Sequence, residues 1–140
     1  MSTREFDIIV YGATGYTGRL VAEYLASHYG SRDDGPKWAM AGRSLAKLEE
    51  VRDLIGAPAT TPLVVANADD DADLEAMCAR TRVVLTTVGP YQLYGDKLVA
   101  ACVKTGTDYA DLCGEPAWMA AKIAEHQAAA EASGARICFS

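Results

Sequence analysis

Short apolar runs alternate with segments of helical periodicity along the whole chain, and this alternation constrains the fold more than any other feature. Most of the runs are rich in β-branched side chains, as in strands that are buried on both faces of a sheet. Strands are expected at Phe6–Tyr11, Lys37–Ala41, Leu63–Ala66, Val83–Thr87, Thr107–Leu112 and Ala135–Phe139. Helices between successive strands imply parallel pairing through right-handed crossovers. The sequence therefore predicts an α/β fold with a doubly wound parallel sheet of about six strands, in the order 3-2-1-4-5-6.

Between the runs, leucine and valine recur at the spacing of an amphipathic helix. The first helix is expected to end near Gly30, and a polar turn follows at Ser31–Pro36. The acidic run Asp69–Asp73 suits the start of a third helix, because negative charge is stabilised at a helix N-terminus. One helix is expected behind the fourth strand, through Leu98–Cys102, and an alanine-rich helix runs from about Pro116 to Ala132.

Composition narrows the class of protein. The 140 residues are 50% hydrophobic and 23% charged, which suits one globular domain over residues 1–140. The net charge of −6 argues against sequence-independent nucleic-acid or anionic-membrane binding. The four cysteines lack metal-site spacing, so we expect no metal and reduced, mostly buried thiols.

Nothing in the sequence indicates export or membrane insertion. Met1–Asp7 carries no apolar signal core, and no apolar run has the length of a membrane span. A cytoplasmic protein is therefore expected. The chain stops at Ser140, immediately after an apolar run, so we expect it to be cut from a longer protein.

A glycine-rich turn, Gly12-Ala13-Thr14-Gly15-Tyr16-Thr17-Gly18, directly follows the first predicted strand and enters the first helix. In this position it matches the fingerprint of a dinucleotide-binding Rossmann domain. Gly12 permits the tight turn, Gly15 lets the backbone approach a pyrophosphate, and Gly18 allows close helix–strand packing. The helix N-terminus then offers free N–H groups to phosphates. The alternative is a glycine-rich turn that binds nothing. A P-loop is excluded, because it would need glycine at Thr17 and lysine at Gly18.

The end of the second strand indicates which dinucleotide is bound. An NAD-binding domain usually places an acidic side chain there, to hold the ribose 2′-hydroxyl. This chain has Arg43 and Ser44 instead, and the acidic pair Asp33 and Asp34 precedes the strand. Arg43 can pair with a 2′-phosphate, and Ser44 adds a hydroxyl. The pattern predicts NADP(H) rather than NAD(H). The alternative is a solvated arginine that begins the second helix.

Polar residues also follow the third and fourth strands, at the edge where doubly wound sheets bind ligands. Asn67–Asp69 would lie near an adenine, but capping of the third helix is the interpretation that we favour. Thr87–Tyr91 follows the fourth strand, and its Gly89 permits close backbone approach while Pro90 stiffens the turn. This loop should pass near the central ribose and the nicotinamide.

Three side chains at this edge are candidates for catalysis. Asp111 and Glu115 follow the fifth strand and could orient a substrate or donate a proton. Tyr91 is the third candidate. The alternatives are that Glu115 marks the start of a helix and that Tyr91 packs in the core.

Four segments together resemble the saccharopine dehydrogenase-like oxidoreductases: G-A-T-G-Y-T-G at 12–18, A-G-R-S at 41–44, T-V-G-P-Y at 87–91 and Y-x-D-x-x-G-E at 109–115. The glycine turn alone is widely shared, whereas the combination is much more specific. The resemblance runs from Phe6 to Phe139. The members that the chain resembles most are described as trans-acting enoyl reductases.

The resemblance implies an NADP-binding domain followed by a second domain that shapes the substrate pocket and mediates homodimerisation. This second domain is absent from the chain, so we expect NADP(H) binding without activity. In the whole protein, a C=C or C=N bond of a small molecule would be reduced, and the look-alikes suggest a lipid-like or polyketide enoyl substrate. The resemblance implies cofactor contacts at Gly12, Thr14, Gly15, Tyr16, Thr17, Gly18, Arg43, Ser44, Thr87, Gly89 and Pro90.

Two other functions would also use a glycine turn of this kind. A short-chain dehydrogenase needs a tyrosine with lysine four positions on, and Tyr91, Tyr94 and Tyr109 are followed there by glycine, leucine and cysteine. That function is excluded on the residues. A binding module or redox sensor that holds NADP without turnover remains open.

Overall fold

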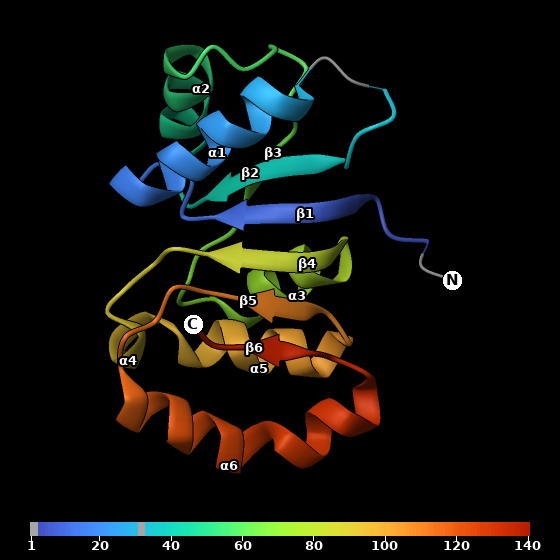
Figure 1. The fold of residues 1–140 in the computed structure, drawn as a ribbon, viewed down its shortest axis with the longest axis vertical. Coiled ribbons are helices and arrows are strands. Elements are labelled where there is room, and N and C mark those ends of the chain that lie inside the picture. Colours follow the sequence, from blue (N-terminus) through green and yellow to red (C-terminus); the bar gives the residue numbers. More distant parts are fainter. Residues whose placement is uncertain (1–2, 31–32) are drawn as a thin grey trace.

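A computed structural model describes residues 3–30 and 33–140 of the chain, so the first part of the predicted turn at Ser31–Pro36 lies outside the described residues. Six parallel strands form one sheet in the order β3-β2-β1-β4-β5-β6, which confirms the predicted fold. Figure 1 shows the strand arrows pointing the same way. The strands are β1 (Phe6–Tyr11), β2 (Trp38–Gly42), β3 (Leu63–Val65), β4 (Thr81–Thr86), β5 (Asp108–Ala110) and β6 (Ile137–Cys138).

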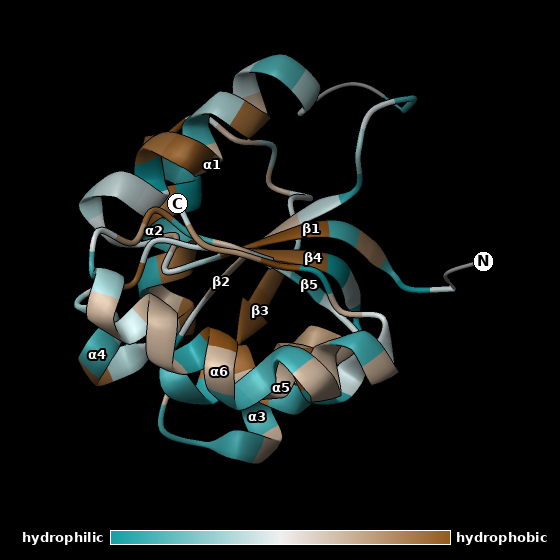
Figure 2. Ribbon diagram, turned by 60° about the horizontal axis from the view of Figure 1, so that its bottom comes forward, coloured by the Kyte–Doolittle hydropathy of each residue, from teal (hydrophilic) through white to brown (hydrophobic). Residues whose placement is uncertain are grey.

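Helices cover both faces of the sheet (Figure 2). They are α1 (Tyr16–Tyr29), α2 (Leu45–Leu54), α3 (Asp71–Ala79), α4 (Tyr91–Tyr94), α5 (Asp96–Thr105) and α6 (Pro116–Ser133). One part of the core joins α1 and α2 to the sheet, through residues such as Leu25 and Leu48. The other part joins α3, α5 and α6 to the opposite face, through residues such as Leu74 and Val99. The sheet is therefore buried between two helical layers.

Several predicted boundaries were wrong. The fourth strand begins at Thr81 rather than Val83, because Phe6 of β1 pairs with Thr81. The fifth and sixth strands are shorter than predicted, with only Ile137 and Cys138 in β6. The helix expected behind β4 through Leu98–Cys102 is α5, but a short helix that was not predicted, α4, precedes it and meets it at Gly95. A side chain at Gly95 would lie 2.5 Å from the Trp118 ring, so packing requires a glycine at this junction.

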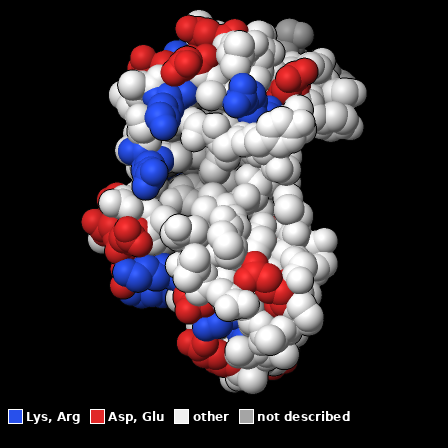
Figure 3. Space-filling view, turned by 90° about the vertical axis from the view of Figure 1, so that its left-hand side faces the viewer, with Lys and Arg blue, Asp and Glu red and all other residues white. Residues whose placement is uncertain are grey.

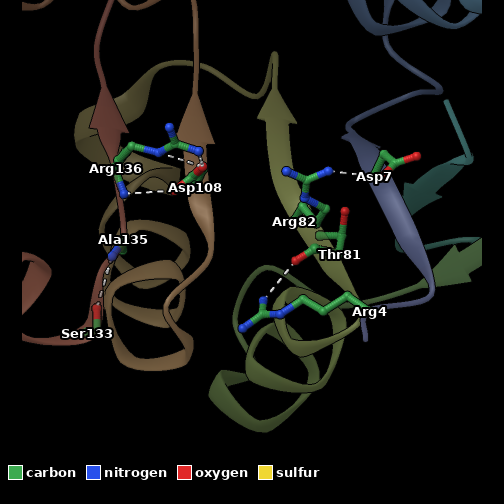
Figure 4. Close-up of polar contacts among 8 residues, drawn as sticks. All are labelled: Arg4, Asp7, Thr81, Arg82, Asp108, Ser133, Ala135 and Arg136. Carbon is green, nitrogen blue, oxygen red and sulfur yellow. Dashed lines mark hydrogen bonds and ion pairs between the residues drawn. The ribbon is translucent and has the colours of Figure 1, made fainter. Parts of the chain in front are cut away.

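The amino-terminal edge of the sheet is held by arginines (Figure 4). Arg4 donates hydrogen bonds to the carbonyl oxygens of Cys78, Thr81 and Thr105 and to the Thr107 hydroxyl. Because Cys78 and Thr105 lie in the last turns of α3 and α5, Arg4 satisfies carbonyl groups that helix ends leave without partners.

Within the part of the chain that is described, none of the helices combines the length and the apolar character needed to cross a bilayer.

Candidate functional site

The glycine turn connects β1 to α1 and is bonded to β2. Gly12 has a φ of +84°, a left-handed conformation that favours glycine. The N–H groups of Gly12 and Ala13 both donate to the carbonyl oxygen of Ala41, at 3.0 and 3.1 Å. These bonds fix the turn at the carboxyl end of the sheet.

Gly18 is required by the packing of α1 on this turn. A Cβ atom at Gly18 would lie 2.0 Å from the Gly12 carbonyl oxygen and 2.9 Å from Thr87 Oγ1. No side chain fits in that space, and the helix rests directly on the turn. This is the close packing expected of the third glycine in the fingerprint.

Gly15 is not required by the protein itself. Its φ of −76° and ψ of 170° are open to any residue, and a Cβ atom there would approach nothing closer than the Gly12 oxygen at 3.5 Å. Gly15 is the N-cap residue of α1 and brings no side chain to cap it. The first amide groups of a helix have no partner within that helix, so the N–H groups of Tyr16, Thr17 and Gly18 are available.

Beside the turn lies a cleft of about 400 Å³, within the size range of ligand sites. Figure 3 looks onto this edge and shows a largely uncharged hollow with Lys and Arg side chains on one rim. The lining residues are Tyr11, Gly12, Thr14, Gly15, Gly42, Arg43, Asn67, Ala68, Asp69, Thr87, Val88, Gly89 and Tyr94. Of the predicted cofactor contacts, those that do not line it are Tyr16, Thr17, Gly18, Ser44 and Pro90.

Arg43 lies at the carboxyl end of β2 with its side chain exposed. Among the described residues, none forms a hydrogen bond or an ion pair with it. Ser44 has a different local role, because its Oγ accepts the N–H of Lys47 at 3.3 Å and caps α2. Asp33, which precedes β2 in the sequence, lies at the opposite end of the sheet, in a hollow beside Phe6 and Lys37.

Asn67–Asp69 line the cleft, and the prediction that they cap the third helix was wrong. The cap of α3 is Asp70, whose carboxylate accepts the N–H of Asp73 at 3.1 Å. The Asn67 side chain instead accepts the N–H of Asp69 at 3.0 Å, and this local turn delays the start of the helix. Asp69 is the only carboxylate among the described lining residues.

Tyr11, Val88 and Tyr94 line the cleft but were not predicted as contacts. Tyr11 ends β1 directly before the turn, and its hydroxyl donates to the Ala66 carbonyl at 3.3 Å. Burial, with the nearby Asp69 charge adding to it, raises the pKa of Tyr11 to about 12. The position of Tyr11 next to Gly12 was a usable sequence signal, whereas Tyr94 enters through a helix that was not predicted.

The loop after β4 forms one wall of the cleft, through Thr87 and Gly89. The Gly89–Pro90 peptide bond is cis. Tyr91 follows, but its ring is buried against Trp118, with ring centres 5.6 Å apart. Its hydroxyl donates to the Thr86 carbonyl at 3.3 Å, and burial raises its pKa. Tyr91 is thus packed in the core, and a catalytic role for it stays a prediction.

Asp111 bonds to groups of the chain rather than to the cleft. It accepts the Tyr109 hydroxyl at 2.6 Å and the N–H groups of Cys113 and Ser140 at 3.0 and 3.1 Å. Burial, followed by this bond from its hydroxyl, raises the pKa of Tyr109 above its usual range. Asp111 does not line the cleft.

Glu115 also faces backbone groups. One carboxylate oxygen accepts the N–H of Tyr91 at 2.7 Å and the other accepts the N–H of Gln92 at 3.1 Å. As in the alternative interpretation, Glu115 stands at the start of its own helix, as the N-cap residue of α6. Its side chain makes no cap bond there, and its two carboxylate oxygens cap α4.

The cysteines are free thiols, and only Cys138 is exposed. The sulfur atoms of Cys78 and Cys102 lie 3.7 Å apart in the core. Over residues 3–30 and 33–140, no three His, Cys, Asp or Glu side chains gather in a way that suits a metal ion.

A parallel sheet of this order, with a glycine turn, a helix N-terminus and a cleft at its carboxyl edge, defines a dinucleotide-binding domain of the Rossmann type. The chain belongs to the family described as the saccharopine dehydrogenase NADP binding domain, whose model matches residues 8–138. This result confirms the resemblance found in the sequence, and it identifies NADP as the cofactor of the domain family.

Known relatives agree with this assignment. Proteins named trans-acting enoyl reductase from Mycobacterium leprae and Mycobacterium tuberculosis are each 53% identical over 135 residues. The match covers 96% of this chain and 31% of each relative, so the chain spans about a third of their length.

Two solved structures share the fold. The Citrobacter sp. triphenylmethane reductase complexed with NADP(H) gives a TM-score of 0.68 at 20% identity, over 96% of this chain and 48% of that one. The apo saccharopine dehydrogenase (L-Glu forming) from Saccharomyces cerevisiae gives 0.66 at 18% identity, over 96% of this chain and 26% of that one.

Proposed function

We propose that the chain binds NADP(H) with the pyrophosphate at the Gly12–Gly18 turn and supplies this cofactor to a reductase. The observation that carries the proposal is Gly15. Backbone conformation accounts for glycine at position 12 and packing accounts for it at position 18, but neither accounts for it at position 15. A ligand that approaches the backbone closely does account for it, beside N–H groups that suit phosphate oxygens.

Arg43 is the proposed partner of the 2′-phosphate. It lines the same cleft as the glycine turn, and its guanidinium has no partner among the described residues. A guanidinium holds a phosphate with paired, charge-assisted hydrogen bonds. No acidic side chain stands at the end of β2 to bind a free 2′-hydroxyl, so the cleft suits NADP(H) better than NAD(H).

The remaining predicted contacts fit this arrangement. Thr14 lines the cleft within the turn, and Thr87 and Gly89 form the wall on the β4 side. Tyr16 and Thr17 would contribute their N–H groups rather than their side chains. When bound, the nicotinamide supplies the hydride chemistry, and the chain's residues bind and orient the cofactor.

For the whole protein, we propose reduction of the C=C bond of a small, lipid-like enoyl compound, because the relatives at 53% identity are named trans-acting enoyl reductases. The substrate pocket and a homodimer contact would belong to a further domain. The candidate catalytic side chains Tyr91, Asp111 and Glu115 support this division, because all three bond to groups of the chain itself. We also propose a cytoplasmic location, where free thiols such as these stay reduced.

Calorimetric titration of the chain with NADPH and NADH at one salt concentration tests the proposal. We expect clear preference for NADPH. Arg43→Ala should weaken NADPH binding by about 1.5–3 kcal/mol, the range for a charge-assisted contact, and leave NADH binding nearly unchanged. The control is Arg82→Ala, which removes the same charge at the opposite, amino-terminal end of the strands. Equal loss for both cofactors would refute the role of Arg43, and binding of neither by the wild type would refute the site.

A further inference from the structure

We infer that Glu115 is a positioning residue that clamps the β4 loop in place as one wall of the cofactor cleft; this inference rests on the proposed function. The loop runs from the end of β4 to α4, and its Thr87 and Gly89 line the cleft. Glu115 lies on a different segment, between β5 and α6.

The clamp consists of two hydrogen bonds from one carboxylate. The Tyr91 and Gln92 N–H groups are the first two of α4, and each donates to a different oxygen of Glu115, at 2.7 and 3.1 Å. Bonds from N–H groups to an ionised carboxylate are about twice as strong as neutral ones. A helix of four residues has little stability of its own, so its position depends on such external contacts.

Side-chain packing also connects the segment after β4 to the segment after β5. The buried Tyr91 ring contacts Trp118 of α6, and its hydroxyl accepts the N–H of Leu112 at 3.4 Å. The Trp118 indole donates to Asp96 of α5 at 2.7 Å. The segment after β4 is therefore fastened to the segment after β5 at several points, and Glu115 supplies the two bonds to backbone groups of α4.

Both carboxylate oxygens of Glu115 are occupied, so the side chain is placed to hold the loop rather than to deliver a proton. Arg43 and the glycine turn belong to other parts of the cleft wall. Loss of the clamp should therefore weaken NADPH and NADH binding equally, without changing the preference between them.

The test compares Glu115→Gln with the control Glu131→Gln, which makes the same exchange on the exposed part of α6. A Gln side chain can accept only one of the two N–H groups and turns its own N–H₂ toward the other. We expect amide hydrogen exchange at Tyr91 and Gln92 to accelerate about tenfold in Glu115→Gln, as expected when a charge-assisted bond is lost. Calorimetry should show both cofactors weakened by a similar factor, about tenfold, with the NADPH/NADH ratio unchanged. The melting temperature checks that each variant folds. Glu115→Asp is a second variant, which keeps the carboxylate charge.

Each contrary result is informative. Unchanged exchange at Tyr91 and Gln92 would overturn the clamp. Faster exchange with unchanged affinity would overturn the positioning role, and so would a changed NADPH/NADH ratio. If the wild type binds neither cofactor, the proposed function fails and takes the positioning role with it, while the exchange data still report whether the clamp exists.

Discussion

Substitution of alanine at Gly15 and at Gly18 should separate cofactor binding from folding. At Gly18 the new Cβ atom would lie 2.0 Å from a backbone oxygen, a distance that real Cβ atoms essentially never show. Because that oxygen belongs to the fixed turn, α1 would have to move by about 1 Å, an overpacking that costs about 3 kcal/mol, the upper end of the usual range. Gly18→Ala should therefore lower the free energy of unfolding by about that amount.

Gly15→Ala should leave stability nearly unchanged. The backbone conformation suits alanine, and the nearest atom to the new Cβ is 3.5 Å away. The lower entropy of the unfolded chain contributes about 0.4–1 kcal/mol of stability, and the weaker N-cap preference of alanine offsets a similar amount. The new methyl group would stand where the pyrophosphate approaches. Loss of two charge-assisted hydrogen bonds, at about 1.5–3 kcal/mol each, predicts NADPH binding weakened by a factor of about 100 or more.

Urea denaturation followed by circular dichroism measures the free energy of unfolding, and calorimetric titration measures the affinity for NADPH. The expected pattern is one stable variant that does not bind and one destabilised variant. A folded Gly15→Ala protein with wild-type affinity would refute the reasoning about the turn. A Gly18→Ala protein as stable as the wild type would show that the contact with Gly12 is not as close as described.

Two further predictions concern stability. Burial raises the pKa of Tyr11 from 10.0 to about 12, so the contribution of its neutral hydroxyl to the free energy of unfolding is complete below pH 10 and is lost as the pH rises from 10 to 12. Denaturation across this range should show a loss of roughly 2–3 kcal/mol in the wild type that is absent from Tyr11→Phe. Identical pH profiles for the two proteins would contradict the shift. Arg4→Ala should lower the unfolding free energy by about 3 kcal/mol, because several partly buried oxygens lose a charged donor. The control Arg82→Ala removes an exposed ion pair with Asp7 at 3.5 Å and should lower the unfolding free energy by less than about 1 kcal/mol. Equal losses of unfolding free energy in the two variants would refute the role of Arg4.

The order and type of the main elements could be predicted because local pattern decides them. The apolar run Phe6–Tyr11 is buried on both faces in the structure, as its composition indicated. Strand ends depend on partners far along the chain. Thr81 joins β4 because it pairs with Phe6, and β6 has two residues because only Tyr109 and Ala110 of β5 pair with it. No local signal carries that information.

In the candidate site, too, some residues could be predicted from local sequence, while the roles of others depend on distant partners. The glycine turn and Arg43 were predicted because their residue types follow strand ends directly, and the structure brings them to one cleft. The roles of Tyr91 and Glu115 could not be derived from sequence, because a tyrosine or a carboxylate at this edge suits chemistry and packing equally. Their bonding partners lie far along the chain and are visible only in the structure. Glu115 meets α4, a helix that the hydrophobic pattern did not reveal.

The central pairing of the sheet has a consequence for the synthesis of the protein. β1 lies between β2 and β4, and its residue Phe6 pairs with Thr81. During translation the first strand, which is almost wholly apolar, therefore has one open edge until β4, at Thr81–Thr86, has been made. Non-local parallel pairing is slow, and an open apolar edge is a site for aggregation. The growing chain is expected to be most dependent on chaperones before residue 86 is available, and least once β4 has closed the centre of the sheet.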